Sequence, residues 1–222
     1  MAHLGILSLD TAFPRIVGDA GNPGSYPFDA KIAVVKHAEA ARVVSDQPLP
    51  EDMVDAFVRT AQELEAGGAS ALVSTCGFLV HAQDRVAQAV RVPVMLSPLS
   101  MYPLVQSICP GRVGVLTASE HALGARTLKA VGIKAADVGG MEHHAAFRDT
   151  FLAPKSHQPD AFSYELIAQL VLQEAQSIAA QNPLSALILE CGNLPPYAPI
   201  LREELGVPVF TILDAATWLM SA

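Results

Sequence analysis

Two cysteines lie in nearly identical surroundings in the two halves of the 222-residue chain. Cys76 lies in SALVSTCG, residues 70–77, and Cys191 lies 115 positions further on in SALILECG, residues 185–192. A thiolate takes up a proton and a thiol releases one, so two thiols on opposite sides of one ligand could move a proton across it. The pair therefore raises the hypothesis of a two-base proton transfer.

The similarity extends beyond the cysteines. The triplet VPV follows both at the same interval, at 92–94 and at 207–209. A weaker match pairs GILS at 5–8 with GVLT at 114–117. Repetition at a constant offset is typical of a duplicated structural unit. The chain is therefore predicted to contain two copies of one unit.

Each unit alternates apolar runs of strand length with segments of helical period. The expected strands are 3–9, 31–35, 70–74, 92–96, 112–117, 135–139, 185–189 and 207–212. The expected helices are 49–68, 79–90, 121–132, 160–181 and 199–206. Near-continuous apolar strands between helices indicate parallel sheets covered on both faces.

The predicted fold class is α/β, with two similar lobes related by a pseudo-twofold axis. Each lobe is expected to hold a mainly four-stranded parallel sheet flanked by helices. The first lobe takes residues 1–98 and the second takes residues 99–212, while a C-terminal helix at 213–222 packs back on the first lobe. Ligands bind outside the carboxyl ends of parallel strands, so the active site is expected between the lobes.

Both cysteines lie at such strand ends. Gly77 and Gly192 follow them and are expected to let backbone amides approach a ligand closely. Asp10 and Glu190 could orient a base or relay a proton, although their charge alone would disfavour a thiolate. The further groups expected around the substrate are Thr75, Phe78, Thr117, Ser119 and Asn193.

The segment 10–30 has no helical period and is expected to be a loop over the strand ends. Arg15 within it either pairs with a substrate carboxylate or ties down the loop at the surface. Asp19 is read as a turn residue. Tyr197, which follows two prolines, is either a packing residue or, as we prefer, a wall of the cleft.

Structural explanations compete with each chemical one. Cys109 has no partner in the repeat and is assigned to packing, since free cysteine is often buried. A redox dithiol lacks a CxxC motif and requires the two sulfurs to touch. His143 and His144 are adjacent, and no spaced partner in the sequence completes a metal site, so we expect them to be loop histidines without a metal.

Composition narrows the range of functions. The chain is 51% hydrophobic with a net charge of -8, which favours a globular protein and disfavours nucleic acid or membrane partners. The first residues show no basic start followed by an apolar run, so a cytoplasmic location is expected. Three cysteines give no disulfide framework.

The cysteine pair in STCGFL and ECGNLPPY, together with LGILSLDTAFPRIVGDAGNPGSYPF at 4–28, resembles the aspartate/glutamate/hydantoin racemase superfamily. The resemblance implies a cofactor-independent racemase or epimerase, and a homodimer. Its substrate would be a small carboxylate-bearing molecule such as an amino acid or a derivative. Cys76 and Cys191 would be the opposed acid and base. In better-known racemases Asn-Thr or Thr-His follows the cysteine, so Gly77 and Gly192 place an amino-acid substrate in question.

Other reactions occur on the fold that the resemblance implies. Maleate-type cis-trans isomerases and arylmalonate-type decarboxylases are alternatives, and the decarboxylases keep only the second-half cysteine. The presence of both cysteines therefore favours a racemase. A non-enzymatic alternative is a small-molecule binding protein whose cysteines only pack, which predicts that cysteine variants still bind the same ligand.

Overall fold

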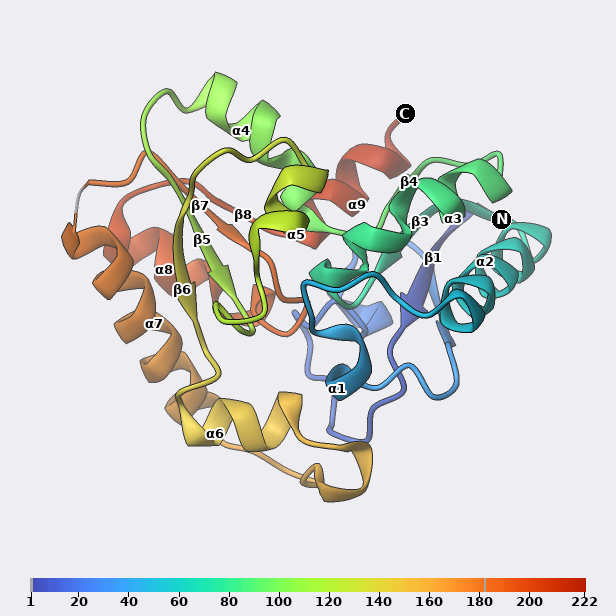
Figure 1. The fold of residues 1–222 in the computed structure, drawn as a ribbon, viewed down its shortest axis with the longest axis horizontal. Coiled ribbons are helices and arrows are strands. Elements are labelled where there is room, and N and C mark those ends of the chain that lie inside the picture. The colour runs from blue at the N-terminus through green and yellow to red at the C-terminus, as the bar shows by residue number, and fades with distance from the viewer. Residues whose placement is uncertain (1, 182) are drawn as a thin grey trace.

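Two four-stranded parallel sheets form the framework of the protein (Figure 1). The structure is a computed structural model that describes residues 2–181 and 183–222. The first sheet has the order β2 (Ala30–Val34), β1 (His3–Ser8), β3 (Ala69–Ser74) and β4 (Val94–Met95). The second has the order β6 (Asp137–Gly140), β5 (Val113–Thr117), β7 (Ala186–Leu189) and β8 (Val209–Phe210). The equivalent orders confirm the predicted two-lobed α/β fold.

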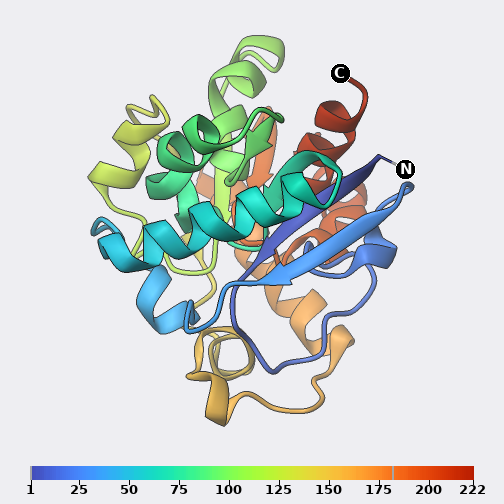
Figure 2. The same ribbon diagram turned by 90° about the vertical axis from the view of Figure 1, so that its right-hand side faces the viewer.

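Helices cover these sheets and fill the connections (Figure 2). In the first lobe they are η1 (Pro23–Ser25), α1 (Ala40–Val43), α2 (Glu51–Ala66), η2 (Gly77–Ala82) and α3 (Gln83–Ala89). The second half contains η3 (Pro98–Met101), α4 (Tyr102–Ile108), α5 (Ala125–Ala130), α6 (Ala145–Phe147), η4 (Arg148–Leu152), η5 (Lys155–His157), α7 (Tyr164–Gln181), η6 (Pro195–Tyr197), α8 (Ala198–Leu205) and α9 (Ile212–Met220).

Helix α2 shows why these segments fold as they do. Glu51 and Asp52 occupy its first turn, where carboxylates interact favourably with the helix dipole. Met53, Phe57 and Leu64 recur at helical spacing and are buried. The amphipathic pattern therefore holds α2 against the sheet of the first lobe.

Helix α9 packs on β3 of the first lobe, although it follows the whole second lobe in sequence. A capping box fixes its start. The Thr211 hydroxyl accepts a hydrogen bond from the Leu213 amide at 3.1 Å, and the Asp214 carboxylate accepts one from the Thr211 amide at 2.7 Å.

The second sheet packs on both of its faces. Val113, Val115 and Ile188 belong to the apolar core that also fills the first lobe. Their neighbours Leu116, Leu187 and Leu189 pack in a separate core that includes residues of α7 and α8. This alternation is the period of two that a β-strand imposes on its side chains. The two lobes therefore share a core, which fixes the relative position of their strand ends.

A polar contact also joins the lobes. The Asp46 carboxylate of the first lobe accepts hydrogen bonds from the Thr127 amide at 2.7 Å, the Thr127 hydroxyl at 2.8 Å and the Arg126 amide at 3.2 Å. These amides belong to the first turn of α5, whose N–H groups have no partner within the helix. Asp46 thus caps a helix of the other lobe.

Local structure differs from the sequence-based expectation in several places. Residues 79–90 were expected to form one helix, but the structure divides the region into η2 and α3. The short elements α1, α4, α6 and η4 were not expected, because each is too short to show a helical period. No helix in the described ranges has the length and hydropathy needed to span a membrane.

Candidate functional site

Cys76 and Cys191 lie opposite each other where the two lobes meet. They form an isolated antiparallel β-bridge, and both line one cavity. Opposed residues in an antiparallel pair direct their side chains to the same face. Each residue is buried, at 8% and 7% relative exposure. The pseudo-twofold arrangement therefore brings the two thiols to a single site, although their strands come from different sheets.

Gly77 and Gly192 make this pairing sterically feasible. A Cβ atom on Gly77 would overlap the carbonyl and carboxylate oxygens of Glu190, and one on Gly192 would overlap the carbonyl oxygen of Thr75. Both glycines were expected to let backbone amides approach a ligand closely. The structure adds a second reason for glycine, because the space that each leaves is occupied by the opposite lobe: by Glu190 at Gly77 and by Thr75 at Gly192.

The cavity between the thiols is small and has two kinds of wall. Its volume of about 20 Å³ is enough for about one water molecule. The apolar wall contains Leu9, Phe13, Phe78, Phe151 and Leu152. The polar wall contains Arg15, Thr75, Glu190 and Asn193. A carboxylate-sized ligand therefore requires the cavity to open.

The surroundings of both thiols favour their protonated forms. Burial raises the pKa of Cys76 and of Cys191, and the charge of Glu190 raises both further. Backbone N–H groups oppose this effect. Those of Phe78 and Leu79 lower the pKa of Cys76, and that of Asn193 lowers the pKa of Cys191. Each sulfur thus has donors from the turn that follows it.

Glu190 is a buried acid between the strand ends. One carboxylate oxygen, Oε2, accepts a hydrogen bond from the Thr117 hydroxyl at 2.8 Å. The other, Oε1, is buried and has no hydrogen-bond partner among the described residues. Burial raises the pKa of Glu190 to about 7, against the lowering effect of the Thr117 hydrogen bond. Its proton can therefore be gained or lost near neutral pH.

A chain of hydrogen bonds orients Asn193 beside Cys191. The Asn193 amide nitrogen donates to Asp19 at 2.7 Å, and Arg15 forms an ion pair with Asp19 at 2.7 Å. The Asp19 carboxylate can only accept a hydrogen bond, so the amide nitrogen of Asn193 faces Asp19. The amide oxygen, Oδ1, therefore faces the thiol and lies 3.5 Å from Cys191 Sγ. This oxygen accepts a hydrogen bond from the thiol and favours the neutral form of Cys191.

Asp19 shows what the sequence could not reveal. Its carboxylate accepts a hydrogen bond from the Gly21 amide at 2.7 Å, as expected of a turn residue. It also connects Arg15 to Asn193, which is 174 positions away in sequence. Phe151 and Leu152 of the cavity wall were missed as well, since no motif marks them.

Several predicted site residues lie outside the cavity lining. Thr117 acts through its hydrogen bond to Glu190. Ser119 donates to the Glu142 carboxylate at 3.0 Å. Tyr197, which we expected as a wall of the cleft, is fully buried in the second-lobe core and stacks on Tyr164 with ring centroids 5.1 Å apart. It is a packing residue.

Asp10 does not line the cavity, and its carboxylate takes part in a contact between the two lobes. Its carboxylate lies 2.5 Å from Lys155 Nζ. The hydrogen bond from Lys155 holds the pKa of Asp10 below its usual value. Gln158 accepts a hydrogen bond from the Ala12 amide at 2.7 Å, and Glu39 accepts one from the Lys155 amide at 3.1 Å. We call these three contacts the latch.

The latch holds a second-lobe segment against the first lobe beside the cavity. That segment follows η4, the short π-helix that supplies Phe151 and Leu152 to the apolar wall. Movement of the segment would therefore move the wall.

Among characterised proteins, the chain is similar to dimethylsulfoniopropionate lyase 7 of Emiliania huxleyi (strain CCMP1516). The two are 23% identical over 241 residues, which cover 99% of this chain and 66% of the lyase. Dimethylsulfoniopropionate lyase 6 of the same strain is 25% identical over 230 residues, covering 99% of this chain and 59% of the lyase. The chain thus spans about three fifths to two thirds of the length of these relatives.

The fold is similar to solved structures of unliganded arylmalonate decarboxylase and of the glutamate racemase isoform RacE1 from Bacillus anthracis. The decarboxylase gives a TM-score of 0.59 at 14% identity, covering 98% of this chain and 90% of that one. The racemase gives a TM-score of 0.57 at 15% identity, covering 99% of this chain and 80% of the racemase chain. A profile described as Asp/Glu/Hydantoin racemase matches residues 23–220, nearly the whole chain and both cysteines. By this match the chain belongs to the Asp/Glu/hydantoin racemase family.

Proposed function

We propose that the protein is a cofactor-independent enzyme that moves a proton at the carbon next to a carboxylate, with Cys76 and Cys191 as base and acid. The observation that carries the proposal is the β-bridge that places both thiols on one cavity. A racemase or epimerase needs this arrangement, because one group removes the proton and the other returns one to the opposite face.

Glu190 and Asn193 assign the starting protonation states in this proposal. The Cys191 thiol donates a hydrogen bond to Asn193 Oδ1, so Cys191 starts as the thiol. The resting surroundings keep Cys76 protonated as well, so in this proposal its proton passes to ionised Glu190, whose Oε1 lies beside Gly77, when the substrate enters the site. The Cys76 thiolate then removes the substrate proton.

The remaining steps balance charge and protons. The electron pair of the broken C–H bond spreads onto the substrate carboxylate, next to Arg15 in the polar wall. Cys191 then donates its proton to the opposite face of the carbon. The product is the other stereoisomer, and the two sulfurs have exchanged protonation states. The reverse reaction, or exchange with Glu190 and solvent, restores them.

A lyase is the second candidate, favoured by the two dimethylsulfoniopropionate lyases that align with 99% of this chain. The first step would be the same removal of a proton next to a carboxylate. The new electron pair would form a carbon–carbon double bond, and the carbon–sulfur bond would break so that dimethyl sulfide leaves with its electrons. This outcome needs a leaving group on the next carbon and only one base.

Deuterium uptake in heavy water, followed by NMR, tests the shared step. The panel contains amino acids, hydantoins, 2-substituted carboxylic acids and dimethylsulfoniopropionate. With a racemase substrate, wild type incorporates deuterium and interconverts the stereoisomers. Cys76→Ser and Cys191→Ser lose interconversion by at least about 100-fold, whereas Cys109→Ser retains it. Release of dimethyl sulfide in place of interconversion would select the lyase.

Retained exchange in the Cys76→Ser/Cys191→Ser double variant would overturn the two-thiol mechanism. A binding protein with packing cysteines predicts a different result. Calorimetry would then show a panel compound that binds wild type and the double variant with equal affinity and undergoes no exchange.

A further inference from the structure

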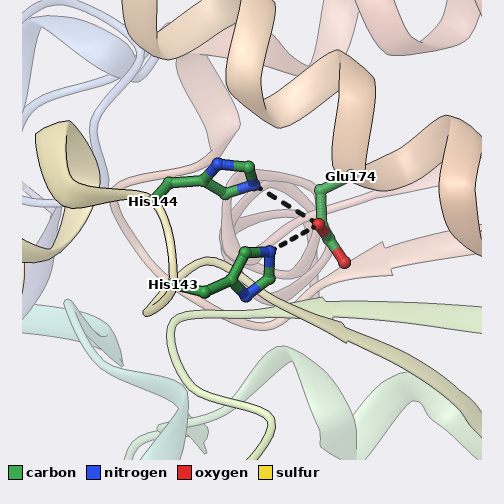
Figure 3. A group of neighbouring side chains, drawn as sticks. All are labelled: His143, His144 and Glu174. Atoms are coloured by element: carbon green, nitrogen blue, oxygen red, sulfur yellow. Dashed lines mark hydrogen bonds and ion pairs between the residues drawn. The ribbon is translucent and has the colours of Figure 1, made fainter.

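Two adjacent histidines converge on one carboxylate at the surface of the second lobe, outside the residues that line the cysteine cavity (Figure 3). The Nε2 atoms of His143 and His144 lie 2.9 Å and 3.3 Å from the same oxygen, Oε2 of Glu174. The three atoms all lie within 4.8 Å of one another. Glu174 belongs to α7 and lies 31 positions after His143 in sequence.

The turn between β6 and α6 explains how neighbouring residues can face one point. In a strand, adjacent side chains point to opposite faces. His144 instead lies at the start of α6 with extended backbone angles, φ -84° and ψ 109°. The two rings are tilted by 43° with centroids 4.3 Å apart. The sequence alone indicated no third partner for the two histidines, and the fold brings Glu174 beside them.

The cluster consists of one carboxylate and two imidazoles. The Glu174 side chain is only 14% exposed, and the ion pairs of the described residues give it no lysine or arginine partner. A partly buried carboxylate is stabilised by a cation nearby. A bound divalent ion would supply that charge.

The geometry fits a transition-metal ion. In a tetrahedral zinc site the ligand atoms lie about 2 Å from the ion, so neighbouring ligand atoms are about 3.3 Å apart. The distances of 2.9 Å and 3.3 Å from Glu174 Oε2 are close to this value. Two imidazoles and one carboxylate are also ligands that zinc accepts. We propose that His143, His144 and Glu174 bind one Zn²⁺ ion, with water completing its coordination.

Exposure gives the ion access to the site. The His143 side chain is 54% exposed, whereas His144 is 12% exposed. The ion can thus enter from the His143 side and keep water ligands there. Because α6 begins after His144 and runs directly into η4, the ion would tie the start of the segment carrying Phe151 and Leu152 to α7. The site does not depend on the proposed proton transfer.

Isothermal titration calorimetry with ZnCl₂ tests the proposal on the 222-residue protein after dialysis against a chelator. Wild type is expected to bind one ion per chain at this site. Glu174→Gln, which keeps the size and a hydrogen-bonding oxygen, and His144→Ala should each weaken binding at least about tenfold. His157→Ala, which removes an exposed histidine in η5, should leave it unchanged. Zinc should also raise the Tm of wild type more than that of Glu174→Gln.

Cobalt distinguishes these ligands from the cysteines. Co²⁺ bound by imidazole and carboxylate lacks the sulfur-to-metal charge-transfer absorption that thiolate ligands produce. That absorption in wild type, affinity retained in Glu174→Gln, or no zinc binding at millimolar concentration would each overturn the proposal. Circular dichroism of each variant checks that lost binding does not reflect unfolding.

Discussion

Cys76 and Cys191 are paired with each other across the lobe interface as the two residues of one antiparallel β-bridge. Backbone pairing between the lobes therefore sets the separation of the thiols. Gly77 and Gly192 permit the pairing, because each lies against backbone of the opposite lobe. Any change that separates the lobes must also separate the thiols.

Gly77→Ala and Gly192→Ala are expected to destabilise the protein by about 1–3 kcal/mol each, because the new methyl group overlaps backbone that cannot turn away. Urea unfolding measures this loss. The control is Gly67→Ala at the end of α2, where φ is -77° and the nearest atom to a new Cβ lies at 3.3 Å. An equal loss in all three variants would contradict the role of the interface.

The reactivity of the three cysteines should differ in the native protein. Burial raises the pKa of Cys76 and Cys191, so alkylation by iodoacetamide at pH 8 should be at least about tenfold slower at these two than at the partly exposed Cys109. Mass spectrometry of the labelled peptides gives the three rates, and unfolded protein provides the reference.

Glu190→Gln should accelerate alkylation of both buried thiols, since the charge of Glu190 raises both pKa values. Unchanged rates at both would mean that the carboxylate exerts no effect on them. A faster rate at Cys191 than at Cys109 in wild type would contradict the burial argument itself.

Glu190 should also make stability depend on pH. Burial raises its pKa from 4.5 to about 7 in the folded protein, so the folded state holds a proton that the unfolded state has released between these values. Its contribution to stability therefore falls as pH rises from about 4.5 to about 7, by about 3 kcal/mol, and is constant above that range.

The variant Glu190→Gln removes this dependence. Between pH 4 and pH 8, the free energy of unfolding of the variant should rise by about 3 kcal/mol relative to that of wild type. Urea unfolding at both pH values measures this difference. Glu203→Gln changes an exposed carboxylate on α8 and serves as the control. If the difference in unfolding free energy between wild type and Glu190→Gln stays constant with pH, the pKa of Glu190 is not raised in the folded protein.

Loss of Lys155 should loosen the latch without unfolding the protein. Lys155→Met removes an ion pair whose lysine is 43% exposed, and exposed pairs contribute about 0–1 kcal/mol. Hydrogen exchange at the Ala12 and Lys155 amides, which donate to Gln158 and Glu39, should then accelerate by up to about fivefold.

Lys31→Met, on the exposed part of β2, should not change these exchange rates and serves as the control.

The pKa of Asp10 is lowered in the folded protein, so the contribution of Asp10 to stability is present above its ordinary value of 3.8. This contribution is lost as the pH falls through the lowered value. The experiment therefore belongs at neutral pH. Equal hydrogen-exchange rates in wild type and Lys155→Met would show that the Lys155–Asp10 ion pair does not stabilise the other two latch contacts.

The repeat in the sequence predicted two equivalent sheets with Cys76 and Cys191 at equivalent strand ends, because strand patterns are local; that the two cysteines meet followed only on the assumption of pseudo-twofold packing. It could not predict the Asp19–Asn193 or Lys155–Asp10 contacts, which join residues more than 140 positions apart without any motif. Tyr197 was misplaced for a related reason. Two prolines predict a turn, but only the packing of Tyr164 against the ring decides which way it faces.

The position of α9 has a consequence for how the chain is made. This helix completes the packing on β3, yet the ribosome synthesises it only after every strand of the second lobe. The first lobe, although α2 already packs on its sheet, still lacks α9 when the strands of the second lobe have been synthesised. We therefore expect the half that is translated first to be the half that matures last, with apolar surface on β3 available to chaperones in the interval.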